Sequence, residues 1–428
     1  MKRVRFYSLF RSILLATIFF IYLQIDIRAQ NPVDAIETCT DPHIKTILLY
    51  RSGWDLSMPV IYSNENESLN LDFDYLDSAA ESYNYSIINC MSDWKLNDAS
   101  ERDYIVGFND VSINDISHSL NTTRSYTHFA AAFPNDELKL FKSGNYLLRV
   151  YKNGEPDKVI LTRKFCIAEN LVDISAVFKQ PDKENQEINL EVNLANLQVQ
   201  NPLNDIKVVI LKNYDWNNKV DITSFALLQD NKLVFNMPYQ ISLAGGNEFR
   251  YFDIKSIKFI SERVSTVRFL NPDYHIFLKA DELKQFKQYV TSKDLNSRYY
   301  IDATDAHKRY VEADYVYVHF TLNAIQPIAS DVYIYGALSN YTANKSNSME
   351  YDPVKSVYEK TLLLKQGYYN YAYATRDQNK KKLDFDITEG IHSETENDYA
   401  VFVYLKDAMS DFDRLVGFKI INSAAEIK

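Results

Sequence analysis

The residues of this chain that could carry out chemistry are seven histidines, three cysteines and 57 carboxylates. No histidines form an H-E-x-x-H or H-x-H pair, and no two cysteines have the spacing of a zinc site. The sequence also lacks glycine-rich phosphate-binding loops and the G-x-S-x-G turn of serine hydrolases. We therefore predict a protein that is not an enzyme, with no catalytic residues, no cofactor and no metal site.

Two groups of carboxylates nevertheless invite a chemical interpretation. Asp72, Asp74 and Asp77 alternate with aromatic residues, and they could offer oxygen ligands to calcium. The alternation favours a strand whose acids point outward. The second group is Glu389, Glu394 and Glu396 around His392, which could form an acid/base site. A polar loop between two strands is the interpretation we favour there.

The three cysteines, Cys39, Cys90 and Cys166, cannot form a complete disulfide framework because their number is odd. A single pair involving Cys39 remains open in an oxidising compartment. The apolar content is high enough to form a core without crosslinks. We expect three unpaired thiols.

The elements that must position these residues are mostly strands. Apolar residues alternate with polar or aromatic ones at 146–151, 188–194 and 315–322, which is typical of strands with one buried face. Helical periodicity is scarce, and only residues 281–290 predict a short helix. The high content of tyrosine and phenylalanine also favours pleated sheets.

A weak internal repeat predicts how these strands are grouped. A glycine followed by an aromatic residue opens a strand at Gly144–Tyr146 and at Gly367–Tyr369, and less clearly at Gly245–Phe249. This pattern resembles the tyrosine corner of immunoglobulin-like sandwiches, which contain about 100 residues. We predict an all-β chain of three consecutive immunoglobulin-like β-sandwich domains, at residues 31–169, 170–295 and 296–425.

Tyrosines at alternate positions of the third predicted sandwich raise a further question. One set must enter the core, whereas another lies either on an exposed recognition surface or beneath a neighbouring domain. Both arrangements remain open for the following residues: Tyr315, Tyr317, Tyr333, Tyr335, Tyr369, Tyr371 and Tyr373.

The start of the chain predicts export from the cytoplasm. A basic beginning precedes an apolar run at residues 13–23, which has the length of a signal-peptide core and is too short to span a bilayer. We predict a signal peptide at residues 1–29, with a short membrane anchor as the alternative. The formal net charge of −10 argues against binding to nucleic acid. No second long apolar segment follows, so we predict no direct membrane insertion.

Ten stretches of the chain together carry a resemblance to a known family: residues 44–53, 71–74, 85–94, 107–110, 126–128, 143–151, 313–320, 336–338, 364–371 and 393–399. They resemble the plug protein of the type IX secretion system of Bacteroidota. In this family the residue before the first glycine is proline, whereas this chain has Ser52 before Gly53, a difference that affects only one turn. The middle third of the chain matches mainly in length and strand rhythm.

The resemblance implies a periplasmic protein bound to the inner side of the outer membrane. It would close the periplasmic opening of the translocon β-barrel when no cargo is in transit, as a monomer within a larger complex. The chain ends at Lys428, directly after the third predicted sandwich, which favours a part of the gate over a secreted cargo. The resemblance identifies no partner-binding residues.

A different function is suggested by residues 332–341, which resemble glycogen-binding sandwich modules. Such modules stack sugars on exposed aromatic rings, and Tyr341 stands where a tryptophan is expected. A periplasmic or surface glycan-binding protein is therefore the alternative function. A secreted hydrolase is a third class, without support from any residue.

Overall fold

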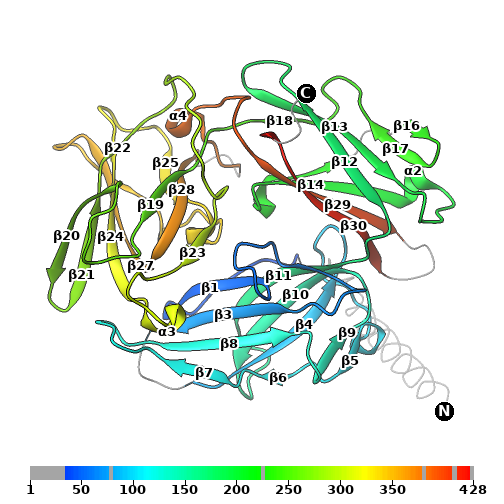
Figure 1. The fold of residues 1–428 in the computed structure, drawn as a ribbon, viewed down its shortest axis with the longest axis horizontal. Helices are drawn as coiled ribbons and strands as arrows, with labels where there is room; N and C mark the ends of the chain where they lie inside the picture. The colour runs from blue at the N-terminus through cyan, green and yellow to red at the C-terminus, as the bar shows by residue number, and fades with distance from the viewer. Residues whose placement is uncertain (1–33, 77–80, 223–226, 378–381, 407–411, 425–428) are drawn as a thin grey trace, which may run out of the picture.

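The computed structural model describes residues 34–76, 81–222, 227–377, 382–406 and 412–424, and these residues form an all-β protein, as predicted. Three bodies of packed sheets lie against one another around a common centre (Figure 1). The predicted signal peptide at residues 1–29 lies outside the described residues. None of the helices in the described ranges is long and apolar enough to cross a membrane.

The first sandwich, at the bottom of Figure 1, consists of a four-stranded and a five-stranded sheet, with a small ribbon of two strands beside them. Phe73, Phe129 and Phe165 lie in the core between the sheets. The four-stranded sheet is β1 (Ile44–Arg51), β3 (Leu69–Tyr75), β8 (Thr127–Phe133) and β7 (Asp115–His118). The five-stranded sheet is β2 (Val60–Tyr62), β11 (Val159–Ala168), β10 (Gly144–Lys152), β4 (Tyr83–Cys90) and β6 (Val111–Ser112). The ribbon is β5 (Ile105–Gly107) and β9 (Leu138–Leu140), which follow the 3-10 turn η1 (Glu101–Asp103).

The second sandwich, at the upper right of Figure 1, combines strands that are far apart in the sequence. Its short helical segments are α2 (Pro202–Asp205) and η2 (Trp216–Asn218). One sheet is β12 (Asp173–Lys179), β13 (Asn185–Asn193), β17 (Lys232–Phe235) and β16 (Leu227–Gln229), with β18 (Ser242–Ala244) paired to β13. The other is β15 (Lys219–Ile222), β14 (Ile206–Lys212), β29 (Asp398–Lys406) and β30 (Asp413–Asn422).

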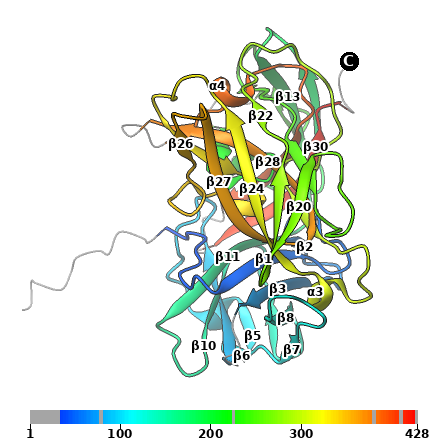
Figure 2. The same cartoon turned by 90° about the vertical axis from the view of Figure 1, so that its left-hand side faces the viewer.

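The third sandwich, at the upper left of Figure 1 and in front in Figure 2, also has two sheets. It contains the short helical segments α3 (Arg309–Glu312), η3 (Ala337–Ser339) and α4 (Asp386–Glu389). One sheet is β19 (Arg250–Asp253), β28 (Gly367–Arg376) and β23 (Tyr299–Ile301), with β25 (Asp331–Tyr335) paired to β28. The other is β20 (Val264–Leu270), β21 (Asp273–Leu278), β24 (Tyr315–Asn323), β27 (Val357–Lys365) and β26 (Glu350–Asp352), with β22 (Asp281–Glu282) paired to β24.

The strand pairings cross the predicted boundary between residues 295 and 296. Strands β19 to β22 precede that boundary but lie in the sheets of the third sandwich. Strands β29 and β30 belong to the second sandwich, since β29 pairs antiparallel with β14 from Ile206↔Leu405 to Lys212↔Tyr399. The spacing of the glycine repeat reflects the size of a sandwich but contains no information about which strands pair. The predicted division at 295/296 therefore does not match the strand pairings, which give the second sandwich strands from both sides of the third.

The alternation that predicted strands has a direct physical basis in burial. Val316, Val318, Phe320 and Leu322 of β24 are all buried in the core of the third sandwich. Strand β29 has no such alternation because both of its faces are covered. One face lies in the core of the second sandwich, and the other packs against the first sandwich.

Two of the three predicted glycine–tyrosine turns have the expected hydrogen bond. The Tyr146 hydroxyl donates to the Lys142 carbonyl at 2.8 Å, and the Tyr369 hydroxyl donates to the Lys365 carbonyl at 2.5 Å. Both rings are buried at the start of a strand. The third turn is different, because its aromatic residue is Phe249, which has no hydroxyl to donate, and β19 begins only at Arg250.

Hydrophobic contacts join the first sandwich to each of the other two. The outer face of the five-stranded sheet packs on β14, β29 and β30, and this cluster includes Trp94, Leu147 and Phe402. Tyr126 and Leu76 of the first sandwich contact Tyr315 of the third. The first sandwich is thus fixed on two sides.

Candidate functional site

The acidic group at the start of the first sandwich lies in the interior of the protein. Asp72 and Asp74 are on β3 and are 4% and 1% exposed. The expectation of outward-pointing acids is therefore wrong, because the third sandwich covers the face of β3 that carries them. Asp77 lies outside the described residues. Among the described residues, no group of three or more His, Cys, Asp or Glu side chains could hold a metal ion.

Asp74 is the centre of a charged network between the first and third sandwiches. Its Oδ2 atom accepts hydrogen bonds from Lys365 Nζ and from the Tyr315 hydroxyl, each at 2.6 Å. Its Oδ1 atom lies 2.8 Å from His128 Nδ1. The interface cluster, as we define it, consists of Tyr50, Asp72, Asp74, His128, Tyr315 and Lys365.

Lys365 comes from the end of β27, and its side chain is buried between the third sandwich and the first. The side chain is 0% exposed, its ammonium donates to the Tyr310 carbonyl at 2.5 Å, and it lies 4.2 Å from the centre of the Tyr126 ring. Burial lowers the pKa of Lys365, and the charge of Asp74 opposes that shift. The charges of Asp72, Asp74, His128 and Lys365 balance when the histidine is protonated.

His128 lies between two carboxylates, with Nε2 3.4 Å from Asp72 and Nδ1 2.8 Å from Asp74. Burial alone would lower its pKa, but the hydrogen bonds and charges of Asp72 and Asp74 raise the pKa to about 9. Its ring also stacks on Tyr310 of the third sandwich. The imidazolium therefore forms part of the contact between the two sandwiches at neutral pH.

A pH dependence of stability follows from this raised pKa. The contribution of His128 to the free energy of unfolding should be fully present below pH 6.5, the ordinary pKa, and lost as the pH rises through about 9. The loss should be on the order of 3 kcal/mol. Urea unfolding of the wild type and of His128→Gln at pH 6 and pH 9.5 measures it. A stability difference between the two proteins that does not change with pH would contradict the assignment.

The second carboxylate group is divided between two environments. Glu389 is buried at the end of α4, whereas Glu394 is exposed and Glu396 is half-buried in the following loop. His392 Nε2 is buried and makes no hydrogen bond within the described residues. The expectation of a polar loop thus fails for Glu389.

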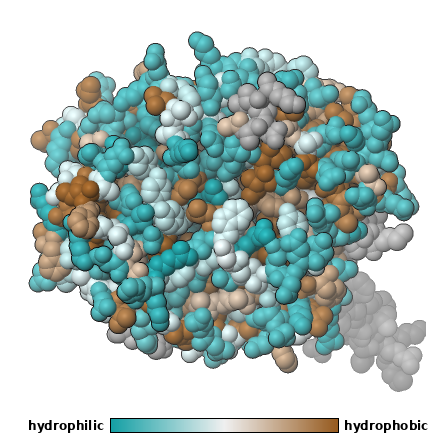
Figure 3. All heavy atoms as spheres, viewed as in Figure 1, coloured by the Kyte–Doolittle hydropathy of each residue, from teal (hydrophilic) through white to brown (hydrophobic). Residues whose placement is uncertain are grey.

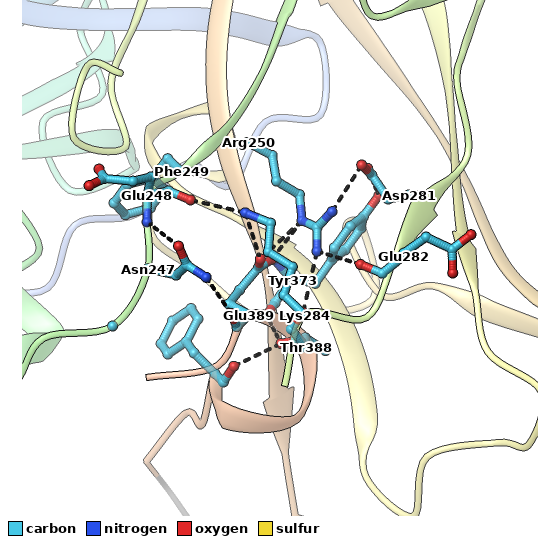
Figure 4. A network of polar contacts seen from close by, with 12 residues as sticks. Asn247, Glu248, Phe249, Arg250, Asp281, Glu282, Lys284, Tyr373, Thr388 and Glu389 are labelled. Atoms are coloured by element: carbon cyan, nitrogen blue, oxygen red, sulfur yellow. Dashed lines mark hydrogen bonds and ion pairs between the residues drawn. The ribbon is translucent and has the colours of Figure 1, made fainter. Parts of the chain in front are cut away.

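Glu389 instead belongs to a buried network around Arg250, shown in Figure 4. Arg250 Nε donates to both Glu389 oxygens at 3.0 Å, and its Nη1 donates to Asp281 at 2.9 Å. Asp281 also accepts hydrogen bonds from Arg263 and from the hydroxyls of Tyr371 and Tyr373. The Arg250 network, as we define it, comprises Arg250, Arg263, Asp281, Tyr371, Tyr373 and Glu389.

The geometry of this network suits a supporting role rather than acid/base chemistry. Both carboxylates are occupied by cations and hydroxyls, and every nitrogen of the Arg250 guanidinium donates a hydrogen bond. A general acid or base needs a free position facing the substrate. The network ties β19, β22 and α4 together within the third sandwich.

A groove of about 280 Å³ lies against this network. Its wall includes Arg263, Lys284, Lys287, Glu282 and Val290. Residues 281–290, predicted as a helix, form the short strand β22 followed by an irregular loop. The helix is not formed because Asp281 pairs with Arg250 and the Lys284 amide donates to the Thr388 carbonyl at 2.9 Å.

The tyrosines of the third sandwich are not an exposed sheet surface. Six of the seven are buried, and only Tyr317 is half-buried. Tyr341, the candidate sugar platform, is held by contacts to the second and third sandwiches. Its hydroxyl lies 2.8 Å from Ser297 Oγ, and its carbonyl accepts a hydrogen bond from Asn217 at 2.8 Å. This arrangement gives no support to sugar stacking on Tyr341.

All three cysteines have free thiols, with Cys39 exposed and Cys90 and Cys166 buried. Burial raises the pKa of the Cys90 thiol to about 12. Cys90 and Cys166 lie in the hydrophobic cluster between the first and second sandwiches, where they act as small apolar side chains.

Few features of the sequence point to the residues that dominate both networks. His128, Arg250 and Lys365 have no motif around them. The one signal was Lys365 at the end of an apolar run, Leu362–Leu364, where a charge requires a buried partner. The partner could not be found because it lies in another sandwich.

Comparison with known families identifies the first sandwich. Residues 44–169 match the model of the family described as "Type 9 secretion system plug protein 1st domain". The resemblance predicted from the sequence is confirmed over this domain, which indicates a role in the type 9 secretion system and a location in the cell envelope.

Comparison with solved structures supports the whole fold. The crystal structure of a hypothetical protein from Parabacteroides merdae ATCC 43184 aligns with a TM-score of 0.87 and 29% identity, and the alignment covers 91% of this chain and 100% of the other. Collagen adhesin from S. aureus aligns at 7% identity with a TM-score of 0.10, over 88% of this chain and 92% of its own, which is no similarity of fold. No curated protein matches the chain significantly.

Proposed function

We propose that this chain binds the outer-membrane translocon barrel and closes its periplasmic opening. The premise is that residues 44–169 are the first domain of a type 9 secretion system plug protein. The family match is the observation that carries the proposal. The protein would act from the periplasm, on the inner side of the outer membrane, as a monomer within the complex. It would do so without catalysis.

The way the sandwiches are joined supports this role. A stopper for a wide barrel must keep its shape against a partner that contacts it over a large area, about 1,000 Å² or more for a specific complex. The interface cluster joins the first and third sandwiches through a fully buried ion pair. The first and second are joined by Tyr404, whose hydroxyl donates to Asn145 at 2.9 Å, and by the Arg414–Glu169 pair at 2.7 Å. The three sandwiches should therefore move as one body.

Deleting the gene for this chain is expected to make the outer membrane permeable to vancomycin, which is too large to enter by ordinary diffusion, because the unoccupied barrel would stay open. The measurement is the minimal inhibitory concentration in the deletion strain, in the complemented strain and in a strain that also lacks the barrel. Sensitivity should rise on deletion and return to the original value in the other two strains. Unchanged sensitivity on deletion would argue against a sealing role.

A direct binding test accompanies the genetic one. The barrel is purified with an affinity tag from cells without cargo in transit, and co-purifying proteins are identified by mass spectrometry. The chain should be recovered in stoichiometric amounts. Its absence from every barrel preparation would refute the proposal.

A further inference from the structure

The groove beside the Arg250 network has a charge that contrasts with the rest of the protein. The chain has a formal net charge of −10. The groove, however, is lined by four cations, Arg250, Arg263, Lys284 and Lys287, and by two acids, Asp281 and Glu282. An acidic protein that concentrates positive charge in one concave place favours an anionic ligand there.

The cations of the groove differ in how many N–H groups they can offer a ligand. Arg250 has no free nitrogen, because it is committed to Asp281, Glu389 and two backbone carbonyls. Arg263 forms one hydrogen bond, to Asp281 at 2.7 Å. Lys284 donates to the Glu248 carbonyl at 3.3 Å and lies 3.7 Å from Glu389. The Lys287 ammonium is exposed and has no ion pair within the described residues.

Two apolar side chains are exposed on the loop that forms this groove. Phe286 is 94% exposed and Val290 is 73% exposed. On the face shown in Figure 3, hydrophobic side chains occur in groups among hydrophilic ones. Apolar residues beside the unpaired Lys287 ammonium and the partly exposed Arg263 and Lys284 match a ligand that presents both carboxylates and apolar side chains, which is a property of a peptide segment and not of inorganic phosphate.

We propose that this groove is a docking site for an acidic, extended segment of a protein partner. Carboxylates of the segment pair with Arg263, Lys284 and Lys287, and its apolar side chains contact Phe286 and Val290. The Arg250 network keeps the wall of the groove in place. The inference deepens the proposed function and rests on it for the identity of the partner, which is the translocon barrel.

The test uses the full mature chain in a binding assay with the purified barrel. Lys287→Glu and Phe286→Ser are the variants, since both side chains are exposed and neither has a folding role. Lys179→Glu on the second sandwich and Phe108→Ser on the first are matched controls, because Lys179 is exposed and Phe108 is 75% exposed. Lys287→Glu should weaken binding roughly three- to tenfold, with the difference shrinking as salt is added. The controls should bind like the wild type.

A second arm uses a synthetic peptide of repeated Asp-Leu-Asp-Phe units and its amide counterpart of repeated Asn-Leu-Asn-Phe units. The acidic peptide should bind the wild type. The amide peptide should not bind the wild type, and the acidic peptide should not bind the Lys287→Glu variant. Equal competition by inorganic phosphate or by phosphatidylglycerol vesicles would overturn the assignment to a protein segment.

The two arms separate this inference from the proposed function. If the wild type binds the barrel and the variants bind equally well, the docking site is wrong and the plug function stands. If the barrel is not bound but the acidic peptide is, the docking site stands and the plug function falls. Failure of both arms overturns both proposals.

Discussion

Replacing Lys365 by methionine is expected to lower the free energy of unfolding by about 3–5 kcal/mol. The ammonium is fully buried and pairs with Asp74 at 2.6 Å, so its removal leaves a buried carboxylate with one cation fewer. The methionine fills a similar volume, and the loss should therefore arise from the charge and not from a cavity. Chemical denaturation at pH 7 measures it.

The control for this variant is Lys360→Met, on the same strand. The Lys360 ammonium is half-exposed and donates only to the Lys345 carbonyl at 3.1 Å, so the change should cost less than about 0.5 kcal/mol. The double variant Lys365→Met with Asp74→Asn should recover part of the loss, because it removes the unpaired charge. A loss below about 1 kcal/mol for Lys365→Met would show that the buried pair does not hold the two sandwiches together.

Replacing Arg250 by methionine is expected to have an effect of similar size, about 3–5 kcal/mol. Asp281 and Glu389 are buried and share this guanidinium, at 2.9 and 3.0 Å, and without it each keeps one more distant or more exposed cation, Arg263 or Lys284. The change should also release residues 281–290, since Arg250 joins the start of this segment, through the Glu282 carbonyl, to the Thr388 carbonyl of α4. Hydrogen exchange at these backbone amides should accelerate.

The matched control is Arg268→Met on β20. Arg268 is exposed and lies 5.3 Å above the Phe277 ring, so its loss should change stability by less than about 1 kcal/mol. If Arg250→Met left hydrogen exchange at residues 281–290 unchanged, the network would not be what positions the groove. Any loss of stability in Arg250→Met would then have a cause other than release of this segment.

The sequence was sufficient for features that depend on neighbouring residues. Alternation at Val316–Leu322 predicted a strand and its buried face, because the period of a strand is local. The glycine–tyrosine pattern likewise predicted tyrosine corners at Tyr146 and Tyr369, because the hydrogen bond of each corner joins residues only four positions apart.

The features that depend on distant residues could not be predicted. Asp72 and Asp74 have the pattern of a strand with one wet face, and nothing near them in the sequence indicates that a third sandwich covers that face. The same limit applies to Asp281, whose neighbours favour a helix while its partner Arg250 lies 31 residues away. The local pattern of a strand therefore cannot show whether a charged residue on its outer face is exposed or is covered by a distant part of the chain.

The discontinuous second sandwich has a consequence for the order of folding. Strand β14 has apolar residues on both faces, and its neighbour β29 follows almost 190 residues later, after the whole third sandwich. As the chain emerges from its N-terminal end, the first sandwich can fold as soon as its own strands are available. The second sandwich cannot, and until residues 398–422 arrive, β14 presents an unpaired hydrophobic edge to the solvent. The last strands to emerge therefore complete the middle of the molecule, and a holding chaperone would be most useful during that interval.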